Sequence, residues 1–135
     1  MESRQLFQLR PIDWQWFIVS YCFLTLFHLL PLFLIAGSTN WFVEPFGFLV
    51  WLALGAAIVS AIIAFQSRGI TILEPGLASI LYTFTLLGTA KTQWLFGHGF
   101  RSVAEQALLL LAVFVIGCCG AIVGEWLQIR KEKNT

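Results

Sequence analysis

One histidine within an apolar run is the residue of this chain best suited to bind a cofactor. His28 lies far from any charged residue, and a neutral imidazole can ligate a haem iron or a chlorophyll magnesium. Ligation of haem by two histidines needs a second one at matching depth, but the only other, His98, lies in a predicted loop. A single ligand from His28 is one interpretation. We favour the other, a neutral histidine hydrogen-bonded to Thr25, Tyr82 or Thr85, so no cofactor is predicted.

Glu74 is the only charged residue of another apolar run, and an intramembrane carboxylate is a candidate proton or cation carrier. The letters TILE, which end at Glu74, also fit the start of a helix. Thr71 would be the N-cap, and Glu74 would accept a hydrogen bond from the Thr71 N–H, which makes a capping box. Ser102 and Glu105 repeat this spacing before the last run, and Asp13 can cap the first run. We therefore predict that Glu74 and Glu105 are capping residues.

Glu125 lies near the end of the last apolar run, where the helix dipole disfavours an anion. The interpretation we favour is an ion pair with Arg68 or Arg130, close to the inner surface of the membrane. The alternative is a proton site on that side, formed by Glu125 together with Glu74.

Four apolar runs must position these residues, at about 14–36, 46–66, 72–90 and 103–127. Each is close to the roughly 20 residues that a helix needs to cross about 30 Å of hydrocarbon. The 135 residues are 59% hydrophobic and 11% charged, against about 25% charged in soluble domains. Backbone polar groups must be paired within lipid, which favours helices. We predict an all-α fold, an integral membrane four-helix bundle that forms a single domain over residues 1–135.

The basic residues are unevenly divided between the two ends of this predicted bundle. Six lie on the side of the chain termini and two on the other side, which are Lys91 and Arg101. The excess of Lys and Arg on cytoplasmic segments predicts that both termini are cytoplasmic, in the cell (inner) membrane.

Small residues recur at helical spacing in the second and fourth runs. Such patterns let helices approach closely in lipid. We predict that these two faces pack together within one chain, and the alternative is contact between copies. The residues are Ala53, Ala57, Ala61 and Ala64 in the second run and Gly117, Ala121 and Gly124 in the fourth.

The sequence lacks the motifs of the common enzyme classes. It contains no nucleotide-binding loop, Ser/His/Asp set or metalloprotease motif. The three cysteines, Cys22, Cys118 and Cys119, do not have the spacing of a zinc site. A net charge of +1 gives no electrostatic argument for binding nucleic acid. We predict no enzymatic activity and no metal site.

Three functions follow from these observations. The leading hypothesis is a non-enzymatic, multi-pass accessory subunit whose partners are the lipid bilayer and other membrane protein subunits. The second is a small oligomeric transporter or channel that uses Glu74, Glu125 or His28. The third is a pigment- or haem-binding membrane protein in which His28 is the ligand.

Overall fold

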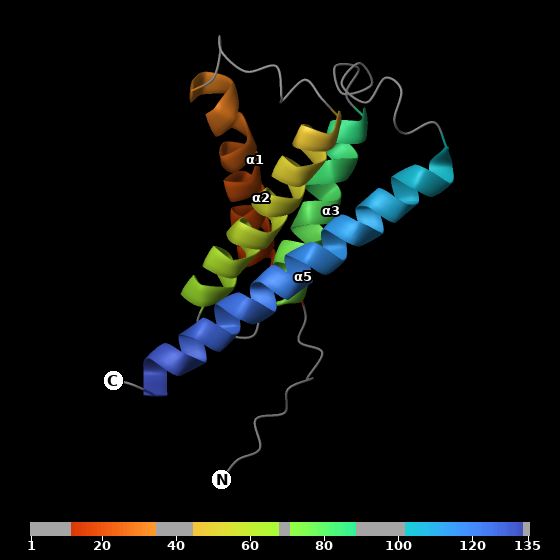
Figure 1. The fold of residues 1–135 in the computed structure, drawn as a ribbon. Coiled ribbons are helices and arrows are strands. Elements are labelled where there is room, and N and C mark those ends of the chain that lie inside the picture. The colour runs from red at the N-terminus through yellow and green to blue at the C-terminus, as the bar shows by residue number, and fades with distance from the viewer. Residues whose placement is uncertain (1–11, 35–44, 68–70, 89–101, 134–135) are drawn as a thin grey trace.

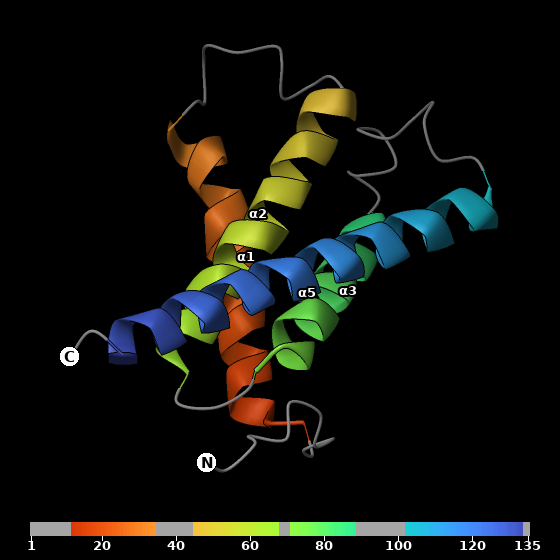
Figure 2. The ribbon, with the colours of Figure 1, turned by 60° about the horizontal axis from the view of Figure 1, so that its bottom comes forward.

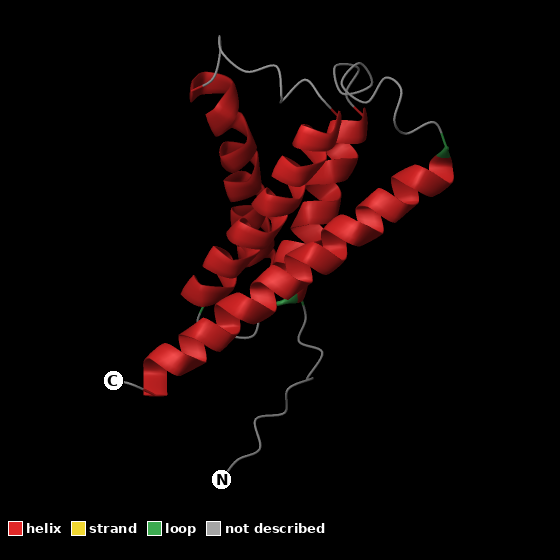
Figure 3. Cartoon of the chain, in the orientation of Figure 1, coloured by secondary structure: helices red, strands yellow, loops and turns green. Residues whose placement is uncertain are grey.

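The computed structural model describes residues 12–34, 45–67, 71–88 and 102–133. This part of the chain is entirely helical apart from short loops and contains no strand (Figure 3). The four helices are α1 (Trp14–Leu34), α2 (Pro45–Gln66), α3 (Leu73–Gly88) and α5 (Val103–Lys133).

Two of the helices begin at the N-caps that the sequence predicts. The Asp13 carboxylate accepts a hydrogen bond from the Gln15 N–H at 3.0 Å, and α1 begins at the next residue. The Ser102 hydroxyl accepts one from the Glu105 N–H at 3.2 Å, immediately before α5. Each contact pairs a backbone donor that has no partner within its own helix.

Two helices, α2 and α5, are long and apolar enough to cross a membrane. Their qualifying segments are Gly47–Gln66, with a mean hydropathy of 2.5, and Val103–Lys133, with 2.7. In α1 the apolar stretch Trp14–Leu29 is shorter, and α3 has 16 residues. The predicted spans 14–36 and 72–90 extend into residues outside the described ranges, so the four-span bundle stays a prediction.

The helix α5 crosses diagonally over α2 and α3 (Figures 1 and 2). It packs mainly against α2 and then against α3, whereas α1 packs against α3 and α2. The core forms where these helices meet and consists of Leu24, Leu52, Ala56, Val59, Ile63, Ala78, Tyr82 and Val113.

Small residues bring α2 and α5 into backbone contact at this crossing. A Cβ atom on Gly120 would lie 2.9 Å from the Ala57 Cα, and one on Gly124 would lie 3.0 Å from the Ala61 Cα. Such short distances leave no room for a side chain, so glycine is required at both positions. Gly120 lies beside the face that the sequence pattern singled out and is part of the contact.

The other small residues of the predicted faces also lie within the chain. Ala64 and Ala121 are fully buried, and Ala53 is half-buried. Gly117 faces α3 as well as α2, because a Cβ atom there would lie 3.1 Å from the Ser79 Oγ. The small-residue face of α5 is therefore used for packing within one chain, as we favoured.

Candidate functional site

The helices α1 and α3 begin, and α2 and α5 end, at the same end of the bundle (Figures 1 and 2). Six polar residues at this end take part in hydrogen bonds between segments. We call this set the polar junction. Its members are Asp13, Ser67, Thr71, Glu74, Glu125 and Gln128.

Glu74 joins the start of α3 to the start of α1. Its side chain is only 6% exposed, and its carboxylate accepts a hydrogen bond from the Asp13 backbone N–H at 3.2 Å. The predicted capping box is wrong, because the Thr71 N–H donates to Glu125 at 2.6 Å and not to Glu74. The helix begins at Leu73, two residues after Thr71, so Thr71 does not hold the position that the box requires.

The connection between α2 and α3 is fastened to α5 by further hydrogen bonds. The hydroxyls of Ser67 and Thr71, both buried, are hydrogen-bonded to each other, and Ser67 Oγ also donates to the Ala64 carbonyl at 3.0 Å. The Gln128 amide of α5 donates to the Ser67 carbonyl at 2.8 Å. Sequence reasoning missed Ser67 and Gln128, although Gln128 follows Glu125 by three residues and so lies on the same face of α5.

The ion pair predicted between Glu125 and Arg130 is also wrong. The Arg130 guanidinium lies over the Trp126 ring, 5.3 Å from its centroid. Residues five apart lie about 140° apart around a helix, so Arg130 faces away from Glu125. The other predicted partner, Arg68, lies outside the described residues.

The polar junction contains two glutamate carboxylates. Glu74 belongs to the first turn of α3, and Glu125 lies near the C-terminal end of α5. Each also accepts a backbone N–H, from Asp13 and Thr71 respectively. Both carboxylates therefore act as acceptors for backbone donors of other segments, and the proton site that Glu125 would form with Glu74 stays a prediction.

His28 is buried between α1, α2 and α3, but its partners differ from those predicted. Its Nδ1 lies 2.7 Å from the Leu24 carbonyl oxygen, and its ring stacks on Tyr82 with centroids 4.7 Å apart. The Thr25 hydroxyl donates to the Tyr21 carbonyl, and the Tyr21 hydroxyl donates to Thr85. Both His28 and Thr25 therefore bond to the carbonyl four residues earlier in their own helix and not to a side chain of α3.

The surroundings of His28 do not fit a haem or chlorophyll. Ligation would need the second ring nitrogen, since Nδ1 is used by Leu24. A Cβ atom on Gly55 of α2 would lie only 2.7 Å from Nε2, so α2 covers this nitrogen. Phe27 stacks on Trp51 beside it, with centroids 4.7 Å apart. Within the described ranges, no three residues among His, Cys, Asp and Glu are grouped to hold a metal ion.

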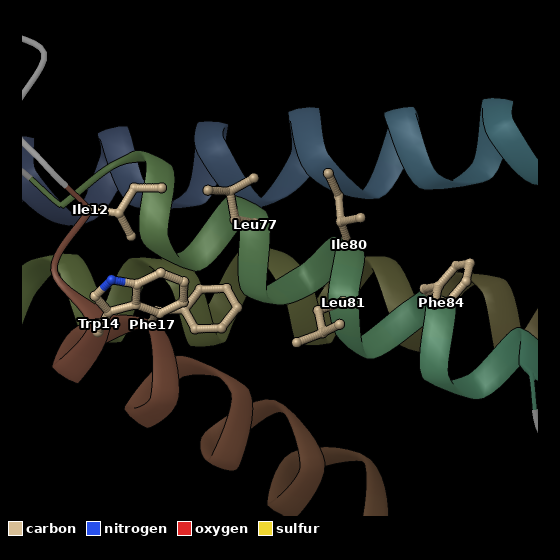
Figure 4. Close-up of a pocket in the computed structure, with 7 residues that line it drawn as sticks. All are labelled: Ile12, Trp14, Phe17, Leu77, Ile80, Leu81 and Phe84. Carbon is tan, nitrogen blue, oxygen red and sulfur yellow. The ribbon is translucent and has the colours of Figure 1, made fainter.

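An apolar groove runs along the outside of the bundle between α1 and α3 (Figure 4). It has a volume of about 250 Å³, and every side chain that lines it is apolar or aromatic. The lining residues are Ile12, Trp14 and Phe17 near the start of α1 and Leu77, Ile80, Leu81 and Phe84 of α3. The groove therefore offers apolar contact and no catalytic group.

Comparison with known proteins found no family model that matches the chain and no similar curated protein or solved structure.

Proposed function

We propose that the chain is a non-enzymatic, multi-pass membrane protein that serves as an accessory subunit and packs against other membrane proteins. The observation that carries this proposal is the apolar outer face of α5. In the most apolar segment of this helix, only 28% of the residues are buried inside the protein. Large apolar residues more than half exposed on this helix are Val103, Leu108, Leu111, Ile122, Val123 and Trp126. An apolar surface of this extent favours contact with lipid or with a partner.

The interior polar groups support a structural role in an apolar medium. Ser20, Ser79 and Thr83 are buried, and each hydroxyl donates to the carbonyl four residues earlier. These hydroxyls find partners within their own helices, as is favourable where no water is present. The distribution of basic residues further favours cytoplasmic termini.

Two measurements test this proposal. In membranes from cells that produce the full chain, extraction with alkaline carbonate should leave the protein in the pellet. Purification in a mild detergent, followed by native mass spectrometry, should recover the chain with another membrane protein in fixed stoichiometry. Recovery as a lone, stable monomer would contradict the accessory role.

A pair of exposed leucines provides matched variants for the second measurement. Leu111→Gln changes the outer face of α5, where the side chain is 59% exposed, and should reduce recovery of the partner. Leu26→Gln changes a side chain of α1 that is 60% exposed and should leave recovery unchanged. Equal effects of the two variants would argue against α5 as the contact face.

A proton or cation transporter is a second candidate, favoured by the presence of two glutamate carboxylates, Glu74 and Glu125, in the polar junction. Proton flux into liposomes that contain the purified chain would support it, provided that Glu74→Gln lowers the flux. Glu105→Gln is the control, because Glu105 is exposed at the opposite end of α5. Absence of flux at high protein loading would rule out this candidate.

A further inference from the structure

The last turn of α5 carries a group of basic side chains. Arg130, Lys131 and Lys133 are all exposed, and they follow directly on the apolar part of the helix. If α5 spans the bilayer as proposed above, basic residues at this position lie at the level of the lipid phosphate groups.

Aromatic rings from two helices hold two of these charges at the ends of α2 and α5. The Arg130 guanidinium carbon lies 5.3 Å from the centroid of Trp126, on the same helix. The Lys131 Nζ reaches across to α2 and lies 5.5 Å from the centroid of Phe65. A guanidinium that rests on a ring keeps its N–H edge for a phosphate, which it can bind with two parallel hydrogen bonds.

The charge of this surface is positive despite two acidic neighbours. The last turn carries three cations and one exposed anion, Glu132, and so a net charge of +2. The other acidic side chain of this part of α5, Glu125, is directed to the polar junction, where it accepts the Thr71 N–H. An anionic group is therefore the complementary partner.

We propose that the ends of α2 and α5 bind the headgroup of an anionic phospholipid, with Arg130 and Lys131, the two cations that rest on aromatic rings, contacting its phosphate. This inference rests on the proposed membrane location. A lipid is favoured over a soluble phosphate because apolar surface adjoins the charges. Trp126 and Ile129, which precede the basic residues in α5, are both exposed. A phospholipid carries both a phosphate, which can contact the basic side chains, and acyl chains, which can contact the exposed apolar side chains.

The test compares the full chain in nanodiscs of phosphatidylcholine with nanodiscs that also contain phosphatidylglycerol. Phosphatidylglycerol should raise the unfolding temperature, and native mass spectrometry of the released protein should show this lipid retained. A basic residue near an anionic surface strengthens binding about fivefold, so Arg130→Gln with Lys131→Gln should weaken retention about 25-fold. Glu132→Gln is the matched control and should retain the lipid at least as well as the wild type.

The possible outcomes separate this proposal from the one on which it rests. A chain that enters nanodiscs but shows no preference for phosphatidylglycerol overturns the lipid site and leaves the membrane location standing. A chain that does not enter nanodiscs contradicts the membrane location itself. Basic residues at a helix C-terminus also interact with the helix dipole. If the double variant is equally destabilised in both nanodiscs, this structural role explains the residues and the lipid site is overturned.

Discussion

The crossing of α2 and α5 predicts a large effect of a single methyl group. In Gly124→Ala, the new Cβ atom would lie 2.9 Å from the Ala61 carbonyl carbon and 3.0 Å from its Cα, and closer still to its oxygen. These are backbone atoms, so no change of side-chain rotamer can make room. The two helices would have to move apart along their main contact.

The magnitude follows from two opposing effects. Overpacking a close contact costs about 1–3 kcal/mol, and a contact with backbone belongs at the upper end of this range. Alanine favours a helix over glycine by about 1 kcal/mol, which offsets part of this cost. We therefore expect Gly124→Ala to lower the free energy of unfolding by about 2 kcal/mol.

The assay measures the unfolding of each purified variant in the same detergent, with tryptophan fluorescence as the readout. Gly88→Ala is the control, because a Cβ atom there would meet nothing within 4 Å, and it should leave stability unchanged or slightly raised. Adding Ala61→Gly should not rescue Gly124→Ala, since the clash is with the backbone of Ala61. If Gly124→Ala proves as stable as Gly88→Ala, or is rescued by Ala61→Gly, the reasoning is wrong.

Three further predictions concern the polar junction and its surroundings. Glu125→Leu removes the acceptor of the Thr71 N–H, so it should lower the free energy of unfolding by about 1–3 kcal/mol. Glu125→Gln retains an acceptor and should lower it less. Asp13→Ala removes the N-cap of α1 and should lower the free energy of unfolding by about 1 kcal/mol in the same assay. Purified protein should show no haem or chlorophyll absorbance, because α2 covers the Nε2 of His28; a visible band that disappears in His28→Ala would refute this geometry.

The sequence predicts well those features that depend on neighbouring residues. Asp13 and Ser102 are N-caps because each lies immediately before an apolar run and can reach an N–H two or three residues later. The helices themselves follow from long runs that lack charges. The small-residue faces of α2 and α5 follow from a periodicity that is visible in the letters alone.

The partners in the polar junction were not predictable in this way. Glu74 and Thr71 have the spacing of a capping box, yet Glu74 binds the N–H of Asp13, 61 residues away, and Thr71 donates to Glu125, 54 residues away. These part-buried backbone donors pair with the acceptor that the crossing of the helices brings near.

The sequence by itself thus determined the apolar helices, two of their caps and the small residues on which they pack. Each of these depends on residues within a few turns of one another along a single helix. Only the tertiary structure decided that Glu74 accepts the Asp13 N–H, that Glu125 accepts the Thr71 N–H, and that α2 closes over His28. These contacts depend on the angle and register at which the helices cross, and backbone contact between Gly124 and Ala61 sets that register.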